Sequence, residues 1–230
     1  MQVRADRVAL DGPHGPLLPA TSLTVAGGEL ALVHGDPGAG LTAFGLALAS
    51  RLRPTTGTVT VHGLAGHEPG TGDAAALREL VAVVDAPGVS EPDEALPLHA
   101  VVAEELDLAG RPAGRDAVRR WLLAHDLAGH ADTRFERMPA ATRTRLLATL
   151  AAGRPGVGML VLDRPDRHTA EVDDWAMLAH EHAERGLAVV VLTATVPVAA
   201  LPAPCAHIGA HEQPEPRRCR SEPAAEGESA

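Results

Sequence analysis

Hydrophobic residues collect in short continuous runs that alternate along the chain with longer amphipathic stretches. The runs carry polar residues only near their ends, and they are ELALVH (29–34), LVAVVD (80–85), GMLVLD (158–163) and LAVVVLT (187–193). Runs of this kind are typical of strands buried on both faces of a sheet. The stretches at 42–52, 138–152 and 173–185 place apolar residues at helical spacing. Strands that alternate with helices predict an α/β fold with a largely parallel sheet.

Two other regions do not follow this alternation. The N-terminal pieces VRADRVAL and TSLTV, together with TGTVTVHG at 56–63, mix apolar and polar positions as half-buried strands do, and they predict an N-terminal antiparallel β element. The Pro- and Glu-rich stretch APGVSEPDEALP leads into helical segments, so a helical subdomain is expected at about 88–137. The polar, proline-bearing sequence at 211–230 predicts a disordered tail, which leaves 1–210 as one domain.

Charge, apolar run length and cysteine count limit the kinds of protein that this chain can be. The 230 residues carry a net charge of −10, and the twenty basic residues are all arginines scattered along the chain. This balance argues against nucleic acid as a partner. No apolar run approaches the ~20 residues that span a bilayer, and the N-terminus lacks a signal-peptide pattern, so a cytoplasmic protein without direct membrane insertion is expected. Cys205 and Cys219 are too few for a disulfide framework or a zinc site.

The sequence HGDPGAGLTAF links a buried strand to a helix. Its layout is that of the phosphate-binding loop G-x-x-x-x-G-K-[ST], with Leu41 where the lysine is expected. The backbone N–H groups of Gly35, Gly38, Ala39 and Gly40 are still expected to surround a phosphate, at a helix N-terminus that favours negative charge. Because the chain contains no lysine, no other lysine replaces the missing ammonium group.

The order of these elements resembles the nucleotide-binding subunit of an ABC transporter over about residues 3–210. In that family the loop is followed by a glutamine loop, a helical subdomain, an LSGGQ-type signature, a Walker B strand ending in Asp-Glu-Pro, and a switch histidine. The corresponding segments here are VVDAP with Asp85, MPAATRTRL at 138–146, LVLDRP with Asp163 and Arg164, and VVLTAT with Ala194. Five landmarks in the right order and spacing carry this resemblance.

The resemblance implies a fold and a ligand. The fold would be that of the P-loop NTPases, in the version found in ABC ATPases. The ligand would be ATP with Mg²⁺, held by the loop from Gly35 to Thr42 and by Asp85. The hydroxyl of Thr42 and the carboxylate of Asp163 would serve as the metal ligands.

Three departures from the family pattern predict that hydrolysis is lost. Leu41 lacks the ammonium that contacts the β- and γ-phosphates, and a hydrogen bond to a charged group contributes roughly 1.5–3 kcal/mol, so affinity should fall about ten- to a hundredfold. Arg164 stands where the family glutamate activates water, and arginine cannot accept a proton at neutral pH. Ala194 cannot make the hydrogen bonds of the switch histidine. We expect weak or absent ATP binding, little or no hydrolysis, and no intact catalytic residue.

The resemblance also implies partners, because family subunits dimerise head to tail and associate with membrane permease subunits. In this chain Pro139, Ala140 and Ala141 replace the serine and the two glycines of the signature. A pair with an intact second ABC ATPase subunit would therefore contain no complete site. This favours a structural or regulatory subunit in transmembrane transport, held at the inner face of the cell membrane by its partners. Two alternatives stay open: a scaffold outside transport, and an ATPase that uses atypical residues.

Two side chains near the expected site have competing interpretations. Arg164 is interpreted as the partner of Asp36 or Asp85 in a salt bridge, as an exposed residue at a strand end, or as a new phosphate contact. His14 lies near the position where the family stacks an aromatic ring on adenine, and it is otherwise a turn residue.

Other polar side chains are expected to be structural. Arg143 and Arg145 follow the signature segment and are expected to be solvated helix residues. His180 and His182 are expected on the surface, because residues two apart on a helix point away from each other and do not form a metal site together. Both tryptophans lie on amphipathic stretches and are expected to pack in a core.

Overall fold

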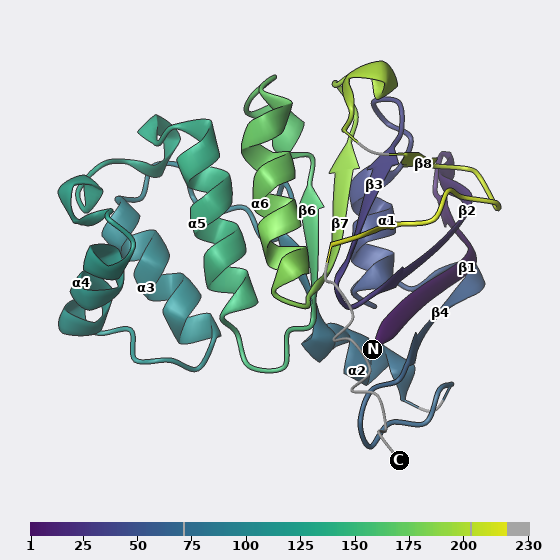
Figure 1. Ribbon diagram of the computed structural model, residues 1–230, viewed down its shortest axis with the longest axis horizontal. Coiled ribbons are helices and arrows are strands. Elements are labelled where there is room, and N and C mark those ends of the chain that lie inside the picture. The colour runs from purple at the N-terminus through teal and green to yellow at the C-terminus, as the bar shows by residue number, and fades with distance from the viewer. Residues whose placement is uncertain (71, 203, 220–230) are drawn as a thin grey trace, which may run out of the picture.

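The computed structural model describes residues 1–70, 72–202 and 204–219. It consists of one mostly parallel sheet, one antiparallel sheet and six α-helices within these residues (Figure 1). The antiparallel sheet lies at one end of the molecule, and helices α3 and α4 lie at the other. The expected α/β class, with a largely parallel sheet and an N-terminal antiparallel element, is confirmed.

The central sheet has the strand order β5-β6-β7-β3-β8, and all of these neighbours are parallel. A short strand, β9, pairs antiparallel with β3. The strands are β3 Glu29–His34, β5 Val81–Val84, β6 Met159–Asp163, β7 Ala188–Thr193, β8 Cys205–His207 and β9 Arg217–Arg218. β5, β6 and β7 are buried along their full length, which explains why they appear in the sequence as continuous apolar runs.

The second sheet is built from the N-terminal hairpin and one later strand. Its order is β2-β1-β4, with both pairs antiparallel. The strands are β1 Gln2–Gly12, β2 Gly15–Ala26 and β4 Thr56–His62. One face of this sheet packs on the core and the other faces solvent, as the alternating burial along β2 shows.

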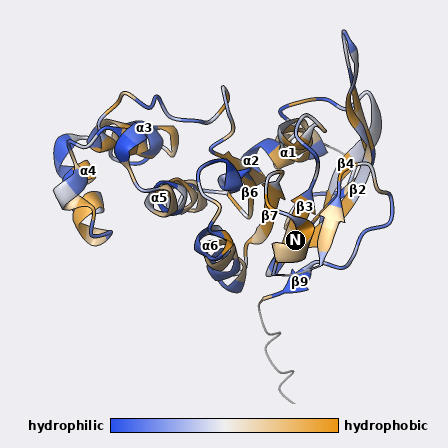
Figure 2. Ribbon diagram, turned by 90° about the horizontal axis from the view of Figure 1, so that it is seen from above, coloured by the Kyte–Doolittle hydropathy of each residue, from blue (hydrophilic) through white to orange (hydrophobic). Residues whose placement is uncertain are grey.

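Helices cover the central sheet on both faces. Figure 2 shows α1 and α2 on one side of the central strands and α6 on the opposite side. Successive strand residues therefore enter different cores: Leu32 packs with helices α3 to α6, whereas Val33 packs with α1, α2 and the antiparallel sheet. The helices are α1 Leu41–Leu48, α2 Asp73–Leu80, α3 Leu98–Leu108, α4 Arg115–Ala124, α5 Ala140–Ala152 and α6 Val172–Glu184.

The element boundaries correct the sequence-based expectations in several places. Helix α1 ends at Leu48 rather than at residue 52, and α2, β8 and β9 had not been predicted. The helical subdomain expected at 88–137 contains α3, α4 and the 3-10 turns Ala128–His130 and Phe135–Arg137. The two remaining 3-10 turns are Pro165–Arg167 and Val198–Ala200.

The expected disordered tail is wrong for its first nine residues. Residues 211–219 are described, and β9 within them binds the edge of β3, with Arg217 opposite Leu30. The remainder of that prediction, 220–230, lies outside the described residues. No helix in the described ranges combines the length and the apolar character needed to cross a membrane.

Candidate phosphate-binding site

The loop after β3 is held between an interior strand and a helix. β3 lies between β7 and β8, and the Gly35 N–H donates a hydrogen bond to the Thr193 carbonyl at 3.2 Å. Gly38 and Gly40 have φ of 87° and 92°, which favour glycine. A Cβ on Gly40 would lie 2.3 Å from the Leu17 carbonyl oxygen. Glycine is required at this position because the β2 backbone passes directly against the loop.

The two predicted metal ligands meet at the base of this loop. The Thr42 hydroxyl donates a 2.8 Å hydrogen bond to Oδ2 of Asp163, although 121 residues separate them. Asp163 ends β6 and is buried, and its Oδ1 has no hydrogen-bond partner among the described residues. Burial raises the pKa of Asp163, and the hydrogen bond from Thr42 and the charge of Arg164 offset only part of this effect.

A pocket of about 200 Å³ opens above the loop. It is lined by Leu17, Pro37, Gly38, Gly40, Leu41, Thr42, Ala43, Arg164 and Ala194. The three positions that depart from the family pattern, Leu41, Arg164 and Ala194, therefore face one space although they come from three segments of the chain. Leu41 is buried and Ala194 is half-buried. Because both side chains are apolar, neither presents a charged or hydrogen-bonding group to this space.

Arg164 adopts a left-handed backbone conformation, with φ 50° and ψ 60°, and lines the pocket. Its Nε lies 3.6 Å from Oδ1 of Asp163, and the side chain is one-third exposed. Of the three interpretations of Arg164, the one that pairs it with Asp36 or Asp85 is wrong. The ion pair is made with the adjacent aspartate, because the left-handed turn directs the side chain back toward Asp163.

Asp85, at the position of the family glutamine, is engaged elsewhere. Both of its oxygens accept hydrogen bonds from Arg143, at 3.0 and 3.1 Å, and His168 Nε2 lies 3.0 Å from Oδ2. Arg167 adds an ion pair at 3.1 Å. Burial acts to raise the pKa of Asp85, but the hydrogen bonds from His168 and Arg143 outweigh it and the pKa is lowered. Asp85 is not among the residues that line the loop pocket.

Arg143 and Asp85 are the buried centre of a group that we call the Asp85 cluster: Asp85, Glu91, Glu94, Arg143, Arg167 and His168. The Arg143 side chain is 4% exposed and contacts Glu94 at 3.1 Å. Its guanidinium lies 4.6 Å from the centre of the Phe135 ring. The expectation of a solvated helix residue is therefore wrong for Arg143. It holds for Arg145, which is half-exposed and pairs with Glu181 at 2.8 Å.

Asp166 had no assigned role in the sequence, but it joins the end of β6 to the end of β7. Its Oδ2 accepts hydrogen bonds from the hydroxyls of Thr193 and Thr195 and from the backbone N–H groups of Ala194 and Thr195, at 2.6–2.9 Å. Burial acts to raise the pKa of Asp166, and these hydrogen bonds lower it overall. No sequence signal distinguishes Asp166 from an exposed turn residue.

Comparison with known proteins supports the landmarks found in the sequence. No protein-family model matches the chain. The hemin import ATP-binding protein HmuV of Rhodopseudomonas palustris is 29% identical over 212 residues, which cover 83% of this chain and 72% of that protein. The five landmarks lie in family order on the fold described above. The chain is similar in sequence and in fold to the ABC transporter ATP-binding cassettes.

Solved structures agree with this assignment at the level of the fold. A dimeric ATP-binding cassette in a post-hydrolysis state, bound to ADP and Pi, matches with a TM-score of 0.64 at 17% identity, over 96% of this chain and 100% of that one. The ATP-binding subunit of an ABC transporter matches with a TM-score of 0.59 at 14% identity, over 85% and 80% of the two chains.

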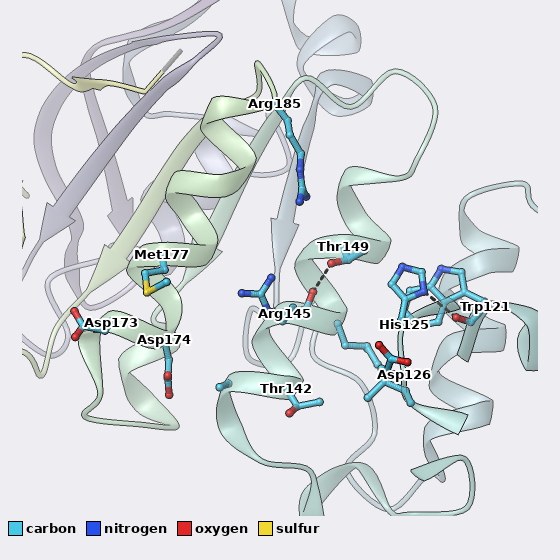
Figure 3. Close-up of a pocket in the computed structure, with 13 residues that line it drawn as sticks. Trp121, His125, Asp126, Thr142, Arg145, Thr149, Asp173, Asp174, Met177 and Arg185 are labelled. Atoms are coloured by element: carbon cyan, nitrogen blue, oxygen red, sulfur yellow. Dashed lines mark hydrogen bonds between the residues drawn. The ribbon is translucent and has the colours of Figure 1, made fainter. Parts of the chain in front are cut away.

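The segment at the position of the family signature borders a second hollow, larger than the loop pocket. Helix α5 begins at Ala140, directly after Pro139 and without a side-chain cap. Ala141 and Thr142 line a hollow of about 640 Å³ between α5, the start of α6 and the end of α4. Figure 3 shows Asp174 on α6 across this hollow from Thr142 on α5. The space is separate from the loop pocket, with which it shares no lining residue.

The structure also places the histidines and tryptophans singled out in the sequence. His14 is exposed in the turn between β1 and β2 and does not line the loop pocket. His182 is buried rather than on the surface, and neither ring nitrogen has a hydrogen-bond partner among the described residues. Both tryptophans are buried, as expected. The described residues include no group of three or more His, Cys, Asp or Glu side chains suited to a metal ion.

Proposed function

We propose that this cassette is a subunit of a transmembrane transport system whose own site binds ATP weakly or not at all and hydrolyses little or none. The observation that carries the proposal is the shared pocket of Leu41, Arg164 and Ala194. A pocket lined in this way offers no lysine to the phosphates and no group that accepts a proton from water.

The nearby carboxylates do not supply the missing base. Asp163 is buried and is not among the residues that line the loop pocket, and one of its oxygens accepts a hydrogen bond from Thr42. Both oxygens of Asp85 are held by Arg143. A general base needs a free oxygen within hydrogen-bond reach of the attacking water. This argues against an ATPase that uses Asp85 and Arg164 as atypical catalytic residues.

The site nevertheless keeps part of the fit for Mg²⁺ and a nucleotide. Gly38 of the loop borders open space, and Thr42 and Asp163 already touch each other at the place where the metal would bind. Mg²⁺ would there neutralise charge on the phosphate oxygens. Two family contacts with the nucleotide are missing: Leu41 replaces the lysine, and Asp85 is held by Arg143. The fit is therefore partial, and weak binding is the expected result.

The partners follow from the family and from its named members. HmuV is named as an import ATP-binding protein, and one matching structure is a cassette dimer. For this chain we propose a membrane permease subunit and a second cassette as partners, and a cytoplasmic location at the inner face of the membrane. The domain would comprise residues 1–210, with the helical subdomain at about 88–137.

The proposal is tested by phosphate release from ATP and Mg²⁺, measured on the purified chain beside an Asp163→Ala variant. We expect equal background rates for the two proteins. Turnover that requires Asp163 would contradict the proposal. The matched positive control restores the family groups on both halves of the site, by Leu41→Lys, Arg164→Glu and Ala194→His together with Pro139→Ser, Ala140→Gly and Ala141→Gly.

Association with a permease is a separate test. The chain is co-expressed with candidate permease subunits of transport systems, and membranes are isolated. Co-purification of the chain with that permease is expected, and its loss after changes in the 86–97 stretch would locate the contact. A chain that stays in the soluble fraction under these conditions would favour a scaffold outside transport.

A further inference from the structure

We propose that Arg164 is the anion-binding cation of the loop pocket and that it makes phosphate binding independent of Mg²⁺. The proposal rests on the proposed function, since it concerns the same pocket. It departs from the family pattern in one respect: the positive charge comes from the residue after the Walker B aspartate instead of from the loop itself.

The position of Arg164 is the first support. Among the described residues that line the pocket, Arg164 is the one charged side chain. The pocket also contains Gly38, Gly40 and the start of α1, where backbone N–H groups favour an anion. A guanidinium added to this arrangement supplies the charge that Leu41 does not.

The backbone at Arg164 is the second support. A non-glycine residue in the left-handed region is strained, and such strain persists only where the surroundings fix it. Here the Arg164 N–H donates to the Leu192 carbonyl at 3.0 Å, and its own carbonyl accepts from the Arg167 N–H at 3.0 Å. These bonds hold the turn that carries the side chain to the pocket rather than out along the strand direction.

The third support is a set of unused polar atoms. Nε of Arg164 and Oδ1 of Asp163 are both buried without a hydrogen-bond partner among the described residues. Their separation of 3.6 Å is too long for a hydrogen bond. A guanidinium has five N–H donors in a planar fork that matches two phosphate oxygens. Because Nε and Oδ1 are enclosed by protein, a bound phosphate would accept from the terminal N–H groups of the Arg164 side chain, which is one-third exposed.

The same ion pair explains why Mg²⁺ is not needed. Arg164 already places a positive charge beside the Asp163 carboxylate, which is buried to 2% exposure. A divalent cation bound to that carboxylate would meet the guanidinium at close range, and like charges repel strongly in a low-dielectric site. Arg164 thus takes over the charge of the metal, and Mg²⁺ and Arg164 compete for the same carboxylate.

The ligand class is a polyphosphate, either alone or as part of a nucleotide. The test is calorimetric titration of the full chain with ATP and, separately, with inorganic pyrophosphate, each in Mg²⁺ and in EDTA. For both probes we expect dissociation constants that agree within about twofold between Mg²⁺ and EDTA. Arg164→Ala should weaken binding at least about tenfold in both conditions, whereas Arg164→Lys should retain part of the affinity.

A matched control is Arg145→Ala, which removes an exposed arginine that pairs with Glu181 outside the pocket. It should leave both dissociation constants unchanged. Denaturation midpoints of all variants separate a loss of binding from a loss of folding. If Arg164 served only to neutralise Asp163, Arg164→Ala would lower the midpoint and leave phosphate binding intact.

Three results would overturn the proposal: no binding of either probe to the wild type at millimolar concentration, binding that requires Mg²⁺, or equal binding by wild type and Arg164→Ala. These outcomes are distinct from failure of the proposed function, which is measured by turnover. Hydrolysis that depends on Asp163 would contradict the proposed function even if Arg164 were found to bind phosphate.

Discussion

The loop pocket contains Arg164, which precedes the 3-10 turn Pro165–Arg167, and the Asp85 cluster contains Arg167 at its end; the two regions use arginine in opposite ways. In the cluster, Arg143 and Arg167 meet carboxylates on nearly every side, and both oxygens of Asp85 are bonded. In the pocket, Arg164 has one distant ion pair and an unbonded buried Nε. A fully paired arginine fixes the structure, whereas a partly paired one leaves donors for a ligand.

The cluster joins parts of the chain that are distant in sequence. Asp85 follows β5, Arg143 lies on α5, Arg167 follows β6, and Glu91 and Glu94 lie in the segment before α3. Because ion pairs join these groups around the buried Asp85 and Arg143, the helical segment is tied to the sheet at the position where the family has a glutamine loop. The residue that would contact the ligand in the family is used here as a structural link.

The largest expected effect comes from breaking the cluster at Arg143. Arg143→Leu removes the two hydrogen bonds that Arg143 donates to the buried Asp85 and leaves His168 and Arg167 as its partners, so the cost should lie toward the lower end of the about 3–5 kcal/mol for a broken buried pair. Urea denaturation measures this change. Arg145→Leu, on the exposed face of the same helix, is the control and should cost less than about 1 kcal/mol. Equal effects for the two variants would refute the distinction between paired and exposed arginines.

His182, a buried residue outside both regions, tests how much stability is lost when a titratable ring has no hydrogen-bond partner among the described residues. Burial lowers the pKa of His182 from 6.5 to about 4. The unfolded chain therefore binds a proton that the folded chain does not, and stability is lost as the pH falls from about 6.5 toward 4, by up to roughly 3 kcal/mol.

His182→Leu should remove this part of the acid sensitivity, as measured by urea midpoints at about pH 7 and pH 5. His130→Leu replaces an exposed ring in the turn Ala128–His130 and controls for the substitution itself. If His182→Leu kept the full wild-type loss between the two pH values, another group would have to carry it.

In the loop pocket, Leu41→Lys restores the family cation and tests whether the loop still accepts a phosphate. ATP affinity should rise about tenfold, since a new charge-assisted hydrogen bond contributes roughly 1.4 kcal/mol or more. Calorimetric titration measures the change. Leu46→Lys, a half-buried site on the same helix outside the pocket, is the matched control. No gain with Leu41→Lys would mean that the loop no longer accepts a phosphate.

These regions differ in how far they could be predicted from sequence. The strands and the loop follow from continuous apolar runs and glycine spacing, which local physics largely decides. The burial of Arg143 also had a signal: Arg143, Leu146, Leu147 and Leu150 follow helical spacing along one face of α5, and all are buried. A charged residue on an apolar stripe indicates a buried partner elsewhere in the chain.

The partner of Arg164 had no such signal. Neighbouring residues on a strand point to opposite faces, so a pair between Asp163 and Arg164 is not expected from the sequence. The pair depends on the left-handed turn at Arg164, which the surrounding hydrogen bonds determine. The hydrogen bonds that Asp166 accepts from the end of β7 could not be predicted from the sequence either, because they depend on which strands are neighbours in the sheet.

The smallest expected effect has the opposite sign and concerns Asp163. Its pKa is raised, chiefly by burial, so the folded chain holds a proton there more readily and the charged form at neutral pH opposes folding. Asp163→Asn keeps an acceptor for Thr42 and should stabilise the chain by about 1 kcal/mol near pH 7, with a smaller gain in acid. Asp85→Asn should instead destabilise it at neutral pH, because the lowered pKa of Asp85 marks a favourable charge that is lost only in acid. Urea denaturation measures the change in unfolding free energy for both variants. If the two changes had the same sign, the proposed contrast between Asp163 and Asp85 would be refuted. Opposite signs would show that the charge of Asp163 does not stabilise the fold.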